Sequence, residues 1–171
     1  MATALDDQKK LADLYDEDCH AWAGHQAEAL RRLQATHPSL PLDFEHLIEE
    51  VEDLAESDLR EARSQLVRML SHLLKLEYSA VDRPRRQWLI GVDDARRELR
   101  DTMTATLRNA IEPHLAELYD DARLAARRGL LDHDEVDAAA VLPAVLPYPF
   151  DQLLTRRWYP TNRHGLVDEM L

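Results

Sequence analysis

The chain has 171 residues, of which 45% are hydrophobic and 32% charged, and its formal net charge at pH 7 is −12. That length suits one domain with a core of its own. The negative charge argues against nucleic acid as a partner, because phosphate binding needs a concentrated positive field. The single cysteine, Cys19, excludes an internal disulfide and a cysteine-rich metal site.

The composition predicts a helical protein. Glycine occurs only four times, well below its usual share of about 7%, and the helix formers Ala, Leu, Arg and Glu are abundant. We therefore expect an all-α, single-domain helical bundle over residues 1–171, with about four main helices and an irregular, proline-containing C-terminal tail. No leader peptide is evident and no apolar run approaches ~18 residues, so we expect a cytoplasmic protein without membrane contact.

The first helical region is predicted over about residues 6–34, where apolar residues recur on one face. Asp16 and Asp18 are good N-cap residues, so the pattern allows a break near residues 14–16 and a second, shorter helix. Two prolines and a serine in residues 36–42 then stop the helix. That segment is predicted to be a connector.

The longest helix is predicted to begin at the N-cap Asp43 and to reach about Tyr78, with a break near residue 57 left open. Three polar residues on or beside its apolar stripe lie seven residues apart, so they form one column: Asp58, Gln65 and His72. An unpaired buried polar group costs roughly 1–3 kcal/mol, so a polar column against a core needs partners. This column is the first place to search for a site.

The rest of the chain divides into shorter elements. A third helix is predicted over about residues 86–110. Pro113 suits the first turn of a fourth helix, and Gly129 is a plausible stop for it. Residues 132–137 are acidic and weakly patterned, and prolines break the segment that follows. We expect one last short helix over residues 150–158.

The same periodicity predicts the core, because an amphipathic helix turns its apolar stripe inward. The residues expected to be mostly buried are Trp22, Val51, Leu54, Met69, Leu73, Trp88, Leu99 and Leu118. The C-terminal tail carries many apolar side chains, which could fold back onto the bundle or dock on another chain, and folding back is the alternative we favour. These aromatic residues are Tyr148, Phe150, Trp158 and Tyr159.

Five segments, in order along the chain, form a recognisable set. They are Leu14-Tyr15-Asp16-Glu17-Asp18-Cys19-His20-Ala21-Trp22 with Gln26, Leu47-Ile48-Glu49-Glu50-Val51-Glu52-Asp53-Leu54, His72-Leu73-Leu74-Lys75, Gln87-Trp88 with Arg96-Arg97-Glu98-Leu99, and Pro147-Tyr148 with Asp151-Gln152-Leu153-Leu154. This ordered set, over about residues 14–160, resembles a bacterial family called domain-of-unknown-function family twenty-nine. Cys19 and Leu76 depart from it, where an aromatic residue and a tryptophan are expected. The resemblance implies an all-helical domain and no assigned activity.

Two carboxylates and two imidazoles are candidates for a metal site. They are Asp18, His25, Asp58 and His72. If the first and second long helices pack antiparallel, these side chains could converge on a divalent metal. Di-metal bundles use a pair of Glu-x-x-His motifs, whereas only one such motif occurs in the first helical region, at residues 17–20. We therefore favour a polar seam held by hydrogen bonds, and no cofactor is predicted.

Six arginines and a tryptophan form the strongest positive surface. They are Arg83, Arg85, Arg86, Trp88, Arg96, Arg97 and Arg100. Such a surface could stack against and clamp a nucleic acid or an acidic protein. Acidic residues are interspersed with it, however, and nearby salt bridges favour a self-neutralised helix surface.

An acidic run marks the beginning of the longest helix. Its residues are Glu45, Glu49, Glu50, Glu52, Asp53 and Glu56. The run could bind a cation or a basic partner. Carboxylates also favour the positive end of a helix dipole, so a solvated helix face is the interpretation we favour.

These observations leave three functional hypotheses. The sequence lacks a glycine-rich phosphate loop, Gly-x-Ser-x-Gly and His-Glu-x-x-His, so the first hypothesis is a non-enzymatic cytoplasmic module that contacts another protein or a second copy of itself. The second is a metal-dependent enzyme with a carboxylate and histidine site inside the bundle. The third is nucleic-acid binding through the Arg83–Arg100 surface.

Overall fold

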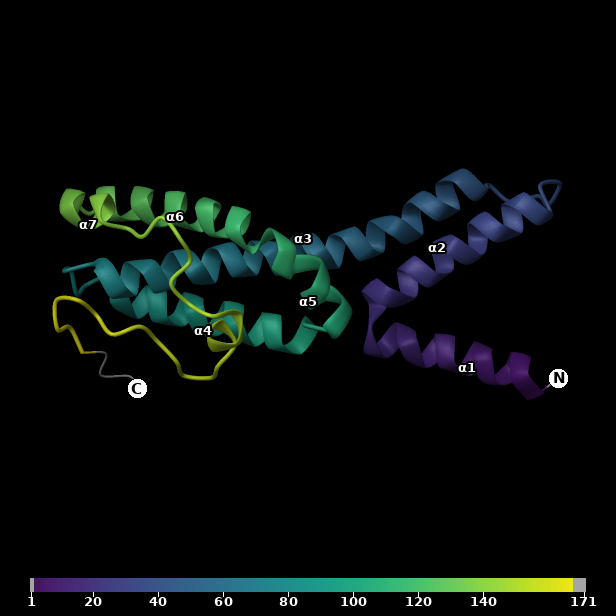
Figure 1. Ribbon diagram of the computed structural model, residues 1–171, viewed down its shortest axis with the longest axis horizontal. Coiled ribbons are helices and arrows are strands. Elements are labelled where there is room, and N and C mark those ends of the chain that lie inside the picture. The colour runs from purple at the N-terminus through teal and green to yellow at the C-terminus, as the bar shows by residue number, and fades with distance from the viewer. Residues whose placement is uncertain (1, 168–171) are drawn as a thin grey trace. The chain divides into compact units, whose positions relative to one another are not determined.

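The computed structural model describes residues 2–167, with side chains from Lys9 onward, and this part of the chain is all-helical with no strand. The helices, labelled in Figure 1 where there is room, are α1 (Ala2–Glu17), α2 (Cys19–Thr36), α3 (Phe44–Tyr78), α4 (Arg85–Thr102), α5 (Ala105–Ile111), the short 3-10 helix η1 (Glu112–His114), α6 (Leu115–Leu131), α7 (Val136–Ala140) and α8 (Phe150–Leu153). The predicted all-α class is confirmed. Among the described helices, none combines the length and the apolar character that crossing a membrane requires.

Cap chemistry explains where α2 and α3 begin. The first helical region breaks at Asp18, whose Oδ1 accepts a hydrogen bond from the Ala21 N–H at 2.9 Å. Asp43 caps α3 in the same way, accepting from the His46 N–H at 3.3 Å. From there α3 continues unbroken to Tyr78, so the N-caps Asp18 and Asp43 and the end of the longest helix are confirmed.

Other boundaries differ from the predictions. The helix predicted over residues 86–110 ends at Thr102, and α5 begins after Thr104, whose hydroxyl accepts from the Leu107 N–H at 3.1 Å. Gly129 does not stop α6: a Cβ at this position would lie 3.2 Å from Cδ of Lys75, so glycine makes room for that side chain. The acidic segment predicted over residues 132–137 runs into α7, which begins at Val136. The last helix, α8, ends at Leu153 and is shorter than the predicted span of residues 150–158.

The contacts divide the chain into two compact units. Unit 1 comprises residues 1–61 and 103–111, and unit 2 comprises residues 62–102 and 112–171. The long helix α3 contributes to both. The prediction of one domain over residues 1–171 stays a prediction, and each unit is described by itself below.

Unit 2 has a dense core around the second part of α3. Leucine and methionine side chains are fully buried around that part of the helix: Leu66, Met69, Leu70, Leu73, Leu74 and Leu76. Helices α4 and α6 contribute Leu99 and Tyr119. The predicted burial of Met69, Leu73, Trp88, Leu99 and Leu118 is confirmed.

The C-terminal segment is fastened to the end of α3 within unit 2. The Asn162 side-chain amide donates to the carbonyls of Leu76 and Ser79 at 2.8 and 2.9 Å, satisfying carbonyls that the helix end leaves free. The Tyr148 hydroxyl donates to Glu77 at 2.5 Å. As expected, the tail folds back: Tyr148 and Phe150 are buried.

Unit 1 has a thin core. The buried hydrophobic residues among its described side chains are Ala23, Ala27, Phe44, Leu107 and Ile111. Helix α2 contacts α1 and α5, and the His20 Nδ1 donates to the Ala55 carbonyl of α3 at 3.0 Å. The predicted burial of Leu54 is wrong, because 45% of this residue is exposed, whereas Trp22 and Val51 are half-buried.

Candidate functional site

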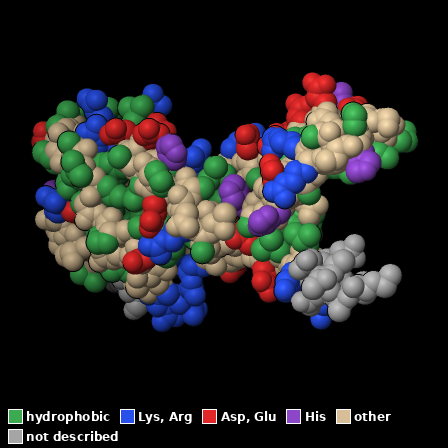
Figure 2. All heavy atoms as spheres, turned by 45° about the vertical axis from the view of Figure 1, so that its right-hand side comes forward, with side chains coloured by type: hydrophobic (Ala, Val, Ile, Leu, Met, Phe, Trp, Pro, Cys, Tyr) green, Lys and Arg blue, Asp and Glu red, His purple; other side chains and the backbone are tan. Residues whose placement is uncertain are grey.

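A groove in unit 2 brings five arginines together, and we call it the arginine groove. It has a volume of about 390 Å³ and is lined by Asp93, Arg96, Arg97, Arg100, Asp101, Arg156 and Arg157. These residues come from α4 and from the segment after α8. In Figure 2, basic side chains form a blue patch on the visible face of unit 2. Five positive charges against two negative ones make the groove attractive to anions.

Arg96 holds the two sides of the groove together. Its Nε donates to the Leu153 carbonyl at 2.9 Å and its Nη2 donates to the Trp158 carbonyl at 2.8 Å. The side chain is almost fully buried, and this burial lowers the pKa of the guanidinium. Because the two carbonyls lie on either side of residues 154–157, Arg96 fixes that segment against α4. Arg96 is thus a positioning residue.

Tyr159 packs against two residues that line the groove, Arg96 and Asp93. The Arg96 guanidinium lies over its ring, 5.3 Å from the centroid, and the Tyr159 hydroxyl donates to Asp93 Oδ1 at 2.5 Å. Burial and then the Asp93 carboxylate raise the pKa of Tyr159, so the ring is a neutral donor at physiological pH. Asp93 is therefore occupied by Tyr159 and Arg96, whose Nη1 is 3.6 Å away.

Three arginines of the groove have no partner inside the described part of the chain. Arg100, Arg156 and Arg157 are exposed, and none of them makes an ion pair or hydrogen bond between residues 9 and 167. Arg97 is also exposed but pairs with Asp94 at 2.8 Å. Arg157 has a φ of 59°, a left-handed conformation that a residue with a Cβ seldom adopts. These side chains supply unsatisfied positive charge at a defined place.

The predicted Arg83–Arg100 surface divides into different environments. Arg85 is buried and donates to the Leu76 carbonyl at 2.8 Å. Trp88 is only 5% exposed, so its ring has no free face for stacking with a base. Arg83 and Arg86 are exposed outside the groove. Only Arg96, Arg97 and Arg100 of the predicted set line the groove.

The four candidate metal ligands occupy separate environments. Asp18 caps α2, His25 is exposed on α2, and Asp58 is exposed on α3, all in unit 1, whereas His72 belongs to unit 2. Within the described residues no group of three or more His, Cys, Asp or Glu side chains could hold a metal ion. The metal hypothesis therefore gains no geometry from the fold and stays a prediction.

Both candidate carboxylates, Asp18 and Asp58, have local structural partners. Burial raises the pKa of Asp18, but the Ala21 N–H and the Thr104 and Thr106 hydroxyls outweigh it, so the pKa is lowered overall. Asp58 lies beside Cys19, where burial first and the Asp58 carboxylate second raise the pKa of the thiol. Cys19 is therefore a protonated packing residue at neutral pH.

The polar column does not act as one unit. Asp58 is exposed, Gln65 is half-buried, and the buried Nδ1 of His72 has no hydrogen-bond partner among residues 9–167. Gly91 lets the imidazole approach α4, because a Cβ there would lie 2.6 Å from the ring. Burial, then Lys75 and Arg68, lowers the pKa of His72 to about 4, so the ring is neutral at pH 7.

Lys75 lies one turn after His72 and is buried without a carboxylate partner. Its Nζ lies over the Trp88 ring, 5.3 Å from the centroid, and its stem packs against Gly129. Burial lowers the pKa of Lys75 to about 8. Lys75 is therefore part of the packed interior of unit 2.

Sequence reasoning missed Arg156 and Arg157. The Arg-Arg pair itself was visible, but it lies 56 residues after Arg100. The hydrogen bonds from Arg96 to the main chain and from Tyr159 to Asp93 bring the two segments together. A helical pattern cannot report such a contact, because the segment after α8 has no regular periodicity.

Comparison with known proteins assigns this all-helical chain to a family. The model of the family described as "Domain of unknown function DUF29" matches residues 14–159, so the chain belongs to that family and the resemblance seen in the sequence is confirmed. The crystal structure of an alpha-helical protein of unknown function from Rhodospirillum rubrum ATCC 11170 is similar, with a TM-score of 0.75 and 29% identity. The similarity covers 84% of this chain and 90% of that chain. No curated protein matches the sequence.

Proposed function

We propose that the chain is a non-enzymatic binding module that holds an acidic segment of a partner protein in the arginine groove. The observation that carries the proposal is the convergence of Arg100, Arg156 and Arg157, three exposed guanidinium groups without an ion-pair partner in the described structure. Guanidinium groups bind carboxylates through paired, charge-assisted hydrogen bonds. The lone cysteine supports the cytoplasm as the compartment.

A peptide carboxylate fits the groove better than a nucleic acid does. The volume of about 390 Å³ suits a few side chains. Trp88 is buried and Tyr159 is engaged with Arg96 and Asp93, so neither offers the free aromatic face on which single-stranded bases stack. A net charge of −12 also repels a long polyanion.

The proposal is tested by fluorescence anisotropy with a labelled glutamate-rich peptide and a labelled single-stranded oligothymidine. We expect the peptide to bind at low salt and its affinity to fall as salt is added, because exposed charges are screened. Replacing Arg156→Ala and Arg157→Ala together should weaken peptide binding about tenfold, which corresponds to ~1.4 kcal/mol.

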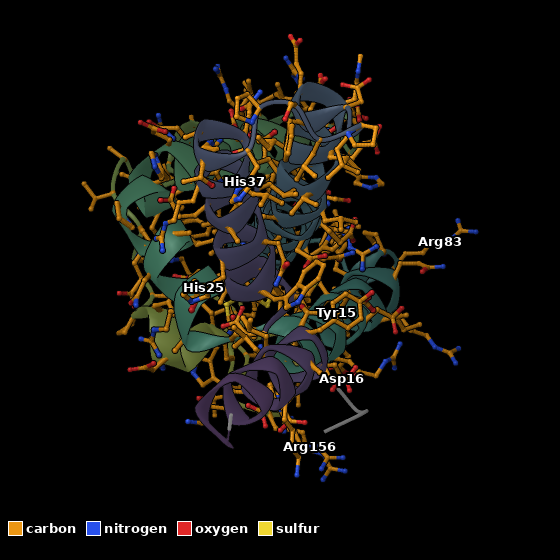
Figure 3. The ribbon with its side chains drawn as sticks, turned by 90° about the vertical axis from the view of Figure 1, so that its right-hand side faces the viewer. Tyr15, Asp16, His25, His37, Arg83 and Arg156 are labelled. Carbon is orange, nitrogen blue, oxygen red and sulfur yellow. The ribbon has the colours of Figure 1, made fainter. Side chains whose placement is uncertain are left out.

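The chain offers a matched control. Arg83→Ala and Arg86→Ala together remove the same charge from exposed positions outside the groove, and Figure 3 shows Arg83 and Arg156 extending away from the ribbon at different edges. We expect this control to change peptide affinity less than twofold. Equal losses in the two double variants would mean that overall charge alone attracts the peptide. Tighter binding of the oligothymidine would favour the nucleic-acid hypothesis.

A further inference from the structure

Unit 1 exposes a leucine face on α3 that its described side chains cover only in part. On α3, Leu47 and Leu54 are 40% and 45% exposed, and Val51 between them is half-buried. A spacing of seven residues is nearly two helical turns, so the two leucines lie in one column. An apolar column at this spacing is the pattern that a helix buries against another helix.

Carboxylates surround this leucine face. Residues 44–61 contain eight acidic residues and one arginine, Arg60. Glu50 lies one turn from both leucines, and Asp58 lies one turn after Leu54. Glu50 is exposed and has no ion-pair partner in the described structure, whereas Glu52, on the side toward α2, is paired with Arg31 at 2.5 Å.

The charge is concentrated in the unit that carries this face. Unit 1 contains 16 acidic and six basic residues, a net charge of −10, whereas unit 2 contains 17 and 15, a net charge of −2. A cationic partner would therefore be attracted to unit 1 from a distance. A second copy would bring the same carboxylates to the same face, and like charges oppose that pairing.

We propose that the leucine face, made by Leu47, Val51 and Leu54, docks an amphipathic helix of a partner whose apolar stripe is flanked by lysine or arginine. Its apolar residues would cover the two exposed leucines, and its cations would meet Glu50. This is the helix-in-groove mode of recognition, in which apolar anchors repeat at helical spacing. The site belongs to unit 1 and goes beyond the arginine groove of unit 2.

The test uses a labelled amphipathic peptide of leucine and lysine and a scrambled peptide of the same composition. We expect the amphipathic peptide to bind more tightly than the scrambled one. Replacing Leu47→Ser and Leu54→Ser together should weaken its binding at least ~10-fold, because its apolar stripe loses its partner. Glu50→Gln should weaken binding less and reduce its dependence on salt.

Unit 2 supplies a control of the same chemistry. Leu124 and Leu131 are 46% and 43% exposed and also lie seven residues apart on one helix, α6. Leu124→Ser and Leu131→Ser together should leave binding within twofold of the parent. Circular dichroism on all variants checks that the exposed substitutions leave the helices intact.

Four results would overturn the proposal. One is equal binding of the amphipathic and scrambled peptides, and another is equal loss in the two leucine double variants. The third is a homodimer by light scattering that Leu47→Ser and Leu54→Ser convert to a monomer, because the occupant of the face would then be a second copy. Absence of peptide binding at low salt would likewise end it.

Discussion

Both units are built from helices, but they differ in the size of their hydrophobic core and in their net charge. Among the described side chains, unit 2 holds 23 buried hydrophobic residues and unit 1 holds five. Unit 1 nevertheless carries a net charge of −10, against −2 for unit 2. Self-repulsion and a small core both weaken a fold. The difference predicts that unit 2 stabilises itself, whereas unit 1 keeps apolar surface exposed to solvent.

The long helix α3 makes the comparison especially direct, because it contributes to both units. From Ala62 to Tyr78 its leucines are fully buried. From Phe44 to Glu61 only Phe44 is buried, and Leu47 and Leu54 are exposed. Both parts carry apolar residues at helical spacing, but residues 44–61 contain eight acidic residues and residues 62–78 contain one. Charge and the packing around each part therefore both contribute to the difference.

The largest expected effect is the difference in stability loss between two leucine truncations, one in each part of α3. Leu73→Ala should lower the free energy of unfolding by ~2–5 kcal/mol, because Leu73 is fully buried. Leu54→Ala should cost less than ~1 kcal/mol, because nearly half of Leu54 already contacts solvent. Urea denaturation measures both values. Equal costs at the two positions would show that the comparison between the units is wrong.

A medium effect is expected at Lys75 in unit 2. The folded state favours the neutral amine, since burial lowers the pKa of Lys75 to about 8. Stability from this group is present above the unfolded pKa of 10.5 and is lost as pH falls through 8. Lys75→Met should therefore stabilise the protein by ~1–3 kcal/mol at pH 7.

The stabilisation by Lys75→Met should shrink as pH rises toward 10. Thermal unfolding of both proteins at several pH values measures this stabilisation. Arg68→Met, at an exposed position of the same helix, controls for loss of a positive charge. A destabilised Lys75→Met protein at pH 7 would mean that the contact with Trp88 outweighs the burial cost.

A smaller effect is expected at His72, where a packing role and metal binding predict different outcomes. His72→Gln should cost ~1 kcal/mol at pH 7, because the imidazole packs against Gly91 and makes no hydrogen bond in the described structure that glutamine would lose. The pKa of His72 is lowered from 6.5 to about 4, so the parent loses stability as pH falls through this range and the variant loses less. Differential scanning calorimetry with and without chelator separates the cases: a large loss that chelator reproduces in the parent would support the metal hypothesis.

The sequence predicted most of the helices for reasons that are local. Asp18 and Asp43 start helices because their carboxylates accept main-chain hydrogen bonds, and that chemistry is visible in the residues themselves. The break before Thr104 was missed, since no proline or glycine marks it. Gly129 was misread as a helix stop because its reason, the side chain of Lys75, lies elsewhere in the chain.

The candidate site depended on contacts that no local pattern contains. Arg97 and Arg100 were predicted as part of a positive surface, but the groove also needs Arg156 and Arg157, which two hydrogen bonds from Arg96 bring to α4. Leu54 was predicted to be buried because periodicity identifies an apolar face. Periodicity does not show whether this chain or another molecule covers that face.

Hydrogen exchange along α3 tests the central claim, that unit 2 stabilises itself and unit 1 does not, most directly. Mass spectrometry of the chain alone would compare amides in residues 66–76 with amides in residues 47–58 of the same helix. We expect the first group to be at least ~10-fold more protected, since exchange follows the stability of the surrounding core. Equal protection of both groups, at the level of global unfolding, would contradict the account.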